Sequence, residues 1–160
     1  MADNLISFLE QNGWKTNLNE QREDSSSNEI LKEYSNLPPE FIEMIEKYQC
    51  IVSEDDTVWF LCNADYNNET ECAFKWNEFE LMSLDAAQGD DDWQKEIEEW
   101  WSDKLPIVLS VRDGYSYYAI DTGNGGTIIN GWEPEFEEAD VVAENFADFV
   151  SKIISGEIVL

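Results

Sequence analysis

Carboxylates are the chemically active groups that this chain holds in abundance. Of its 160 residues, 36 are aspartate or glutamate and none is histidine. Catalytic triads, Cys–His dyads and zinc sites that use histidine are therefore excluded. Two carboxylates across a cleft can hydrolyse a glycosidic bond, but among so many acids such a pair arises by chance and spacing cannot identify it. We therefore expect no catalytic residue and no enzyme.

One polar segment imitates a calcium-binding loop. Asn63, Asp65 and Asn67 follow the spacing of the first EF-hand ligands. However, the position that requires glycine holds Asn68, and the last ligand position holds Phe74 instead of glutamate. We interpret the segment as a polar loop and expect no metal site.

The glycine tract and the cysteines are equally poor candidates for chemistry. Residues 123–126 lack the lysine and serine of a phosphate-binding loop and lie between two expected strands, so we interpret them as a hairpin turn. Cys50, Cys62 and Cys72 have no histidine partner and no Cys-x-x-Cys spacing. Buried, reduced thiols are the expectation, and no cofactor is predicted.

The charge balance is the strongest functional signal. A formal net charge of -27 excludes nucleic acid as a direct ligand and argues against an anionic membrane surface. It also exceeds what solubility requires and costs stability through self-repulsion. An acidic surface raises the encounter rate with a cationic partner by ~10 to 10³. The sequence therefore predicts a basic protein partner.

Two acidic segments are the expected contacts for this partner. Three aspartates precede a helical pattern, and a tryptophan precedes a run of glutamates. The predicted partner-binding residues are Asp90, Asp91, Asp92, Trp132, Glu133, Glu135, Glu137 and Glu138. The alternative interpretation is that the aspartates cap the helix, and that Trp132 and a second acid-flanked tryptophan, Trp76, cover a sheet edge.

Four amphipathic patterns predict helices. They are residues 4–11, a helix that begins at Leu37-Pro38-Pro39-Glu40, a helix that follows Gly89-Asp90, and residues 140–155 with Gly156 as the stop signal. Proline suits a first helical turn because its missing N–H breaks no hydrogen bond there. Trp93, Ile97, Trp100 and Trp101 recur at helical spacing, which predicts that all four pack in the core.

Five segments have the alternation or β-branched composition of strands: residues 57–62, 71–76, 106–111, 115–120 and 127–132. Asp113-Gly114 is typical of a two-residue hairpin. This order of elements predicts an α+β fold, an antiparallel sheet flanked by helices. We expect one domain over residues 1–160, with an N-terminal helix in 1–13, a linker or surface loop in 14–35 and the core in 36–156.

The beginning of the chain and its hydropathy predict a soluble, cytoplasmic protein. Met1–Asn4 lacks the basic and apolar segments of a signal peptide, and no apolar run approaches the ~20 residues of a membrane span.

The order of several motifs resembles the SUKH superfamily, which includes the fungal Smi/Knr-type regulators, Syd and many bacterial immunity proteins. The motifs are Leu37-Pro38-Pro39-Glu40-Phe41, the tract from Leu105-Pro106-Ile107 through Asp113-Gly114-Tyr115 to Gly126-Thr127-Ile128, and residues 142–149 in a closing helix. The resemblance covers residues 36–156. It implies a SUKH-like sheet, flanked by helices, that acts as a binding module without catalytic residues. In bacteria the implied role is that of an immunity protein that neutralises a cognate toxin, frequently a nuclease. The alternative within it is a regulatory or scaffold protein without a toxin.

Overall fold

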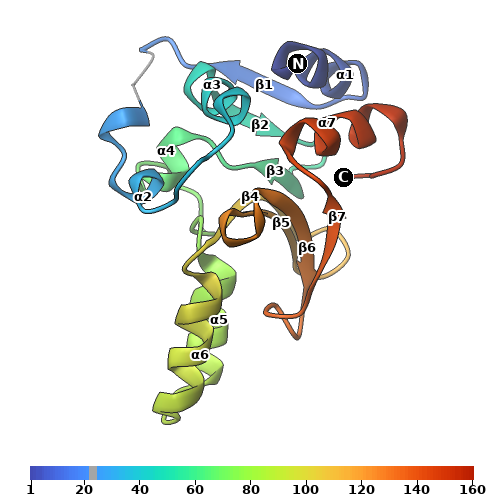
Figure 1. Cartoon of the computed structure of the whole chain (residues 1–160). Helices are drawn as coiled ribbons and strands as arrows, with labels where there is room; N and C mark the ends of the chain where they lie inside the picture. Colours follow the sequence, from blue (N-terminus) through green and yellow to red (C-terminus); the bar gives the residue numbers. More distant parts are fainter. Residues whose placement is uncertain (22–24) are drawn as a thin grey trace.

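The computed structural model describes residues 1–21 and 25–160 and contains one open antiparallel sheet (Figure 1). Its seven strands lie in sequence order, so each strand pairs with its neighbours along the chain. The strands are Lys15–Leu18 (β1), Tyr48–Val52 (β2), Val58–Phe60 (β3), Lys104–Ser110 (β4), Ser116–Asp121 (β5), Thr127–Trp132 (β6) and Ala139–Ala143 (β7). The expected α+β class, an antiparallel sheet flanked by helices, is confirmed.

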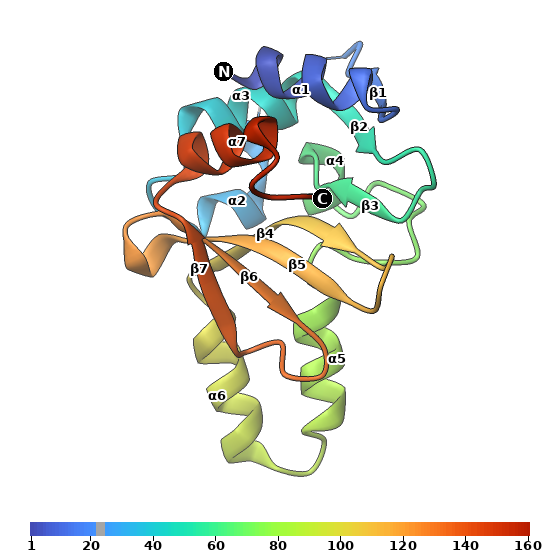
Figure 2. The same cartoon turned by 90° about the vertical axis from the view of Figure 1, so that its right-hand side faces the viewer.

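Helices lie on both sides of this sheet. The α-helices are Ala2–Gln11 (α1), Glu29–Lys32 (α2), Pro39–Lys47 (α3), Asn63–Tyr66 (α4), Glu78–Ala86 (α5), Asp91–Trp101 (α6) and Phe146–Ser155 (α7). Short 3-10 turns cover Ser25–Ser27 and Thr122–Asn124. In Figure 2, α1, α3 and α7 lie together at one end of the molecule, and α5 and α6 form a hairpin that projects from the other. Within the described residues, no helix has the length and hydropathy needed to cross a membrane.

Strand β5 shows how the two helical layers meet the sheet. Successive side chains of a strand point to opposite faces. The ring of Tyr117 packs against Trp101 of α6, with 5.0 Å between centroids, whereas Tyr118 packs against Phe149 of α7 at 5.1 Å. The α5–α6 hairpin and α7 therefore cover opposite faces of the sheet.

Helix α3 begins where the sequence predicts. Pro39 occupies its first turn, and Phe41, Met44 and Ile45 are fully buried. The ring of Phe41 meets Phe146 of α7 edge-on at 5.5 Å. Burial of such side chains contributes about 1.5–3 kcal/mol each, which makes α3 an anchor for the layer that covers this face.

The linker or surface loop expected at residues 14–35 contains regular secondary structure instead. Lys15 to Leu18 form the edge strand β1, which pairs antiparallel with β2, and α2 follows further along the same segment. Strand β2 was itself not expected. Residues 22–24 of this expected linker lie outside the described residues.

Residues 71–76 do not form the predicted strand. They run as an irregular segment in which Phe74 meets Tyr115 edge-on at 5.5 Å and Trp76 packs at 6.0 Å from Tyr66. Because alternating aromatic residues can be buried by packing against other elements, their alternation here imitated a strand.

The predicted helix over residues 140–155 is half wrong. Its first part is strand β7, paired with β6, and α7 begins only at Phe146. The side chain of Asn145 caps α7, its Oδ1 accepting a hydrogen bond from the backbone N–H of Asp148 at 2.9 Å. Gly156 ends α7 at φ +79°, as expected.

Strands β4, β5 and β6 follow their predicted positions closely. The connection between β4 and β5 is longer than a two-residue turn, since it spans residues 111–115. Gly114 within it has φ +91°, which a residue with a side chain rarely adopts.

Candidate partner-binding surface

Helix α6 begins at the predicted aspartates. The Oδ1 of Asp90 accepts a hydrogen bond from the backbone N–H of Trp93 at 3.0 Å, and Asp91 and Asp92 form the first turn. Carboxylates at this end satisfy free N–H groups and oppose the positive pole of the helix. The capping interpretation of the aspartates is therefore correct for Asp90, while Asp91 and Asp92 remain exposed at the tip of the hairpin.

The loop between β6 and β7 is fixed against the α5–α6 hairpin at two points and against β5 at a third. The ring of Phe136 stacks on Phe79 of α5, with centroids 4.6 Å apart and planes 9° apart. The hydroxyl of Tyr117 donates to the Phe136 carbonyl at 2.5 Å, and the Trp101 indole N–H donates to Glu137 Oε1 at 2.8 Å. The glutamates of this loop are thereby held beside α6.

A hollow of about 580 Å³ lies between the hairpin and this loop. Its walls are Met82, Ser83 and Ala86 of α5, Trp93, Glu96, Ile97 and Trp100 of α6, and residues 133–138. Five of these residues are carboxylates: Glu96, Glu133, Glu135, Glu137 and Glu138. Its lining in the described chain includes no lysine or arginine. We call this feature the acidic hollow.

The carboxylates of the acidic hollow lack cationic partners within the described chain. None of the five forms an ion pair with a described lysine or arginine, and Glu137 alone accepts a side-chain hydrogen bond, from Trp101. Trp93 is 47% exposed beside them. The hollow therefore combines uncompensated negative charge with exposed aromatic surface.

The structure brings together only part of the predicted contact set. Glu133, Glu135, Glu137 and Glu138 all line the acidic hollow, whereas Asp90, Asp91 and Asp92 lie outside its lining. Trp132 is exposed, as expected, but lies elsewhere. Its neighbour Gly131 pairs with Tyr117, whose ring faces α6, so Trp132 points to the opposite face of the sheet. The eight predicted residues therefore do not form one continuous surface.

One tryptophan expected in the core is exposed, and another that was considered for the surface is buried. Trp93 was expected in the core and is exposed, because it lies in the first turn of α6, on the part of the hairpin that projects beyond the sheet (Figure 2). Trp76, for which a surface role was left open, is only 8% exposed. The sequence signal that could have marked Trp93 as exposed is its position next to the aspartates that begin the helix.

Negative charge is concentrated around the acidic hollow. Residues 78–101 and 133–138 together make up 30 of the 160 residues but hold 13 of the 36 acidic ones. They include one basic residue, Lys95, which lies 3.8 Å from Glu99 on the same helix. The surplus charge of the chain is thus not spread evenly over its surface.

Crowding of like charges is visible at Glu80 on α5. Partial burial raises the pKa of this carboxyl, and the nearby carboxylates Glu98, Glu137 and Glu33 raise it further. The folded state therefore binds a proton at Glu80 more readily than the unfolded state does. As the pH rises through the ordinary glutamate pKa towards the raised value, stability is lost, because the charged form is disfavoured only in the folded state.

We expect Glu80→Gln to raise the melting temperature at pH 7 and to have no such effect at a pH below the ordinary glutamate pKa. Solvent screening at this half-exposed position limits the gain to about 1–2 °C. Thermal unfolding followed by circular dichroism at both pH values measures it, with the exposed Glu43→Gln on α3 as the control. A gain of equal size at both pH values would show that charge repulsion is not its cause.

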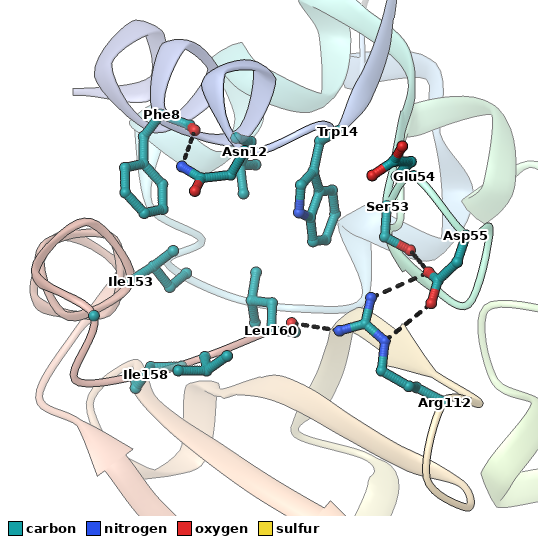
Figure 3. A pocket seen from close by; sticks show the side chains of 13 residues that line it. Phe8, Asn12, Trp14, Ser53, Glu54, Asp55, Arg112, Ile153, Ile158 and Leu160 are labelled. Carbon is teal, nitrogen blue, oxygen red and sulfur yellow. Dashed lines mark hydrogen bonds and ion pairs between the residues drawn. The ribbon is translucent and has the colours of Figure 1, made fainter.

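A second hollow, of about 700 Å³, lies between α1, α7 and the turn after β2 (Figure 3). Its walls are mainly apolar, including Phe8, Trp14 and Ile153. The guanidinium of Arg112 at its edge is already engaged: its Nη2 lies 3.1 Å from Asp55 Oδ1, and its Nη1 donates to the Leu160 carbonyl at 2.8 Å. The hydrogen bond from Arg112, together with those from Thr57 and Ser53, lowers the pKa of Asp55. Of the two acidic side chains in its lining, Asp55 is therefore already paired, and Glu54 alone forms no ion pair within the described residues.

The segments that imitated metal or thiol sites serve other roles. Asp65 does not project as a ligand, because its Oδ2 accepts the backbone N–H of Cys62 at 2.7 Å at the start of α4. Cys62 is buried, and this burial raises the pKa of its thiol. Cys50 is half-buried and Cys72 is exposed, so the expectation of three buried thiols is wrong. Among the described residues, no group of three potential ligands is arranged to hold a metal ion.

Comparison with known proteins adds no relative to this description: no protein-family model matches the chain, and no curated protein is significantly similar to it. The SUKH resemblance remains a prediction from the motifs alone. What the structure defines is an α+β fold that presents an acidic, partly aromatic hollow.

Proposed function

We propose that this protein is a binding module for a basic protein, which it contacts through the acidic hollow and the adjacent tip of the α5–α6 hairpin. The observation that carries this proposal is the set of five carboxylates in one hollow without a described cationic partner. Such a surface steers a cationic partner during its approach and repels anionic ones. The exposed indole of Trp93 adds apolar area that a partner would remove from water.

Within this proposal, the partner is a nuclease toxin and the protein is its immunity protein. A nuclease is basic where it holds nucleic acid, so an acidic protein can cover that site by direct charge complementarity. The complex of the nuclease barnase with its inhibitor barstar is an established example of such electrostatics. The motif order that resembles the SUKH superfamily supports the same role, and a regulatory or scaffold role without a toxin is the alternative.

The test is affinity capture from a lysate of the native host on the immobilised protein. A matched column carries Glu133→Gln/Glu135→Gln/Glu138→Gln, and a control column carries Glu20→Gln/Glu40→Gln/Glu43→Gln, three exposed glutamates outside the hollow. We expect a basic protein on the wild-type and control columns that is depleted on the hollow variant and eluted by 500 mM NaCl.

The captured protein is then purified and assayed for nuclease activity. Inhibition of that activity by the wild-type protein supports the immunity role, and a basic partner without nuclease activity supports the regulatory alternative. Equal capture on all three columns, or capture of acidic proteins alone, would overturn the proposal.

A further inference from the structure

Trp93 is the feature of the acidic hollow that net charge does not explain. It occupies one face of α6 with Glu96, Ile97 and Trp100, which follow it at helical spacing. Ile97 is buried and Trp100 is partly buried, but Trp93 is 47% exposed. An exposed indole at the edge of a concave site is typical of an anchor point for a partner, since tryptophan is enriched among the residues that dominate binding energy.

The protein itself contains an example of a cation held by the same combination of groups. The ammonium of Lys104 lies 4.9 Å from the ring centroid of Trp100, 2.6 Å from Asp103 Oδ1 and 3.6 Å from Asp121 Oδ1. An indole face and carboxylates together thus bind a cation at the base of α6. The acidic hollow offers the same combination around Trp93, and no described lysine or arginine lines it.

We infer that the acidic hollow is a receptor for an arginine side chain of the basic partner, with the guanidinium stacked on Trp93 and paired with the surrounding glutamates. This inference rests on the proposed function and specifies the chemistry of its contact. Arginine fits better than lysine because its guanidinium is planar, stacks on aromatic rings and pairs with carboxylates through two parallel hydrogen bonds. It is also the less strongly hydrated cation, so it loses less on entering the hollow.

The experiment compares two peptides as probes. Each has ten residues and alternates glycine with either arginine or lysine, so the two carry the same charge. Isothermal titration calorimetry at 50 mM NaCl measures their affinities for the wild-type protein, Trp93→Ala and Trp93→Phe. The control is Trp132→Ala, which removes an equally exposed indole, 48% against 47%, from the opposite face of the sheet.

We expect the arginine peptide to bind the wild-type protein more tightly than the lysine peptide. Trp93→Ala should weaken the arginine peptide about five-fold, the magnitude typical of a cation–π contact near a surface, and should remove the preference. Trp93→Phe should retain part of it, and Trp132→Ala should change neither affinity. Circular dichroism establishes that each variant is folded.

The possible failures are distinguishable. Salt-dependent binding of both peptides with equal affinity, or binding that Trp93→Ala leaves unchanged, would overturn the arginine receptor while leaving the proposed function in place. An equal loss of both peptides in Trp93→Ala would assign the hollow to cations in general and likewise end the arginine assignment. Absence of binding by either peptide would contradict the proposed function as well.

Discussion

Replacing Phe79 with alanine is expected to lower the free energy of unfolding by about 3–5 kcal/mol. Phe79 is 2% exposed and lies at the centre of an aromatic cluster: its ring is 4.6 Å from Phe136, 5.8 Å from Tyr115 and 6.0 Å from Tyr117. Alanine would leave a cavity where α5, the β6–β7 loop and the sheet meet. Since domains are stable by only about 5–15 kcal/mol, this is a large share of the total.

Urea unfolding followed by circular dichroism measures the change, with Leu81→Ala as the control on the same helix. Leu81 is 37% exposed, so its truncation should cost well below the Phe79 value. The dependence on urea concentration should keep its slope, which would show that the loss reflects stability and not a different unfolded state. A loss at Phe79 of less than about 1 kcal/mol would mean that the hairpin is held to the sheet by other contacts.

The elements that the sequence predicts correctly are those with strong local signals. Helix α3 has proline in its first turn, α6 has an aspartate cap, and β4 to β6 are long β-branched or aromatic runs separated by glycine-rich turns. Each signal acts within a few residues of the chain, so it is present whatever the rest of the molecule does.

The edge strands carry no comparable signal. Strand β1 contains one aliphatic residue, Leu18, which is 57% exposed, and the strand exists because it pairs with β2 across 30 or more residues of sequence. In β7, Val141 is also 57% exposed, and the two valines extend the apolar pattern of α7 as if the helix began earlier. The Asn145 cap, followed three residues later by Asp148, was the local signal that could have placed the true start.

The candidate site is predictable in composition but not in geometry. The glutamates at 133–138 stand out in the sequence, yet their place beside α6 depends on contacts between distant residues, such as Trp101 with Glu137. Helical spacing correctly groups Trp93 with Ile97 and Trp100. However, spacing does not show where the sheet ends, and it is the projection of the hairpin beyond the sheet that turns Trp93 from a core residue into a surface one.

Reversing the charge of the acidic hollow is expected to slow association with the basic partner about 10- to 100-fold at 50 mM NaCl. The variant is Glu133→Lys/Glu135→Lys/Glu138→Lys, which replaces three exposed carboxylates of the hollow by cations. A cationic partner is attracted over roughly the Debye length, and this length shrinks as salt increases. The wild-type association rate should therefore fall steeply between 50 and 500 mM NaCl, and that of the variant should change little.

Stopped-flow or surface plasmon resonance with the partner recovered on the wild-type column measures these rates. The control variant Glu20→Lys/Glu40→Lys/Glu43→Lys changes the net charge equally but lies outside the hollow. Because field strength falls with distance, the control should slow association by a much smaller factor. Equal slowing by the two variants would assign the effect to net charge alone, and wild-type rates that do not depend on salt would remove electrostatic steering from the function of this surface.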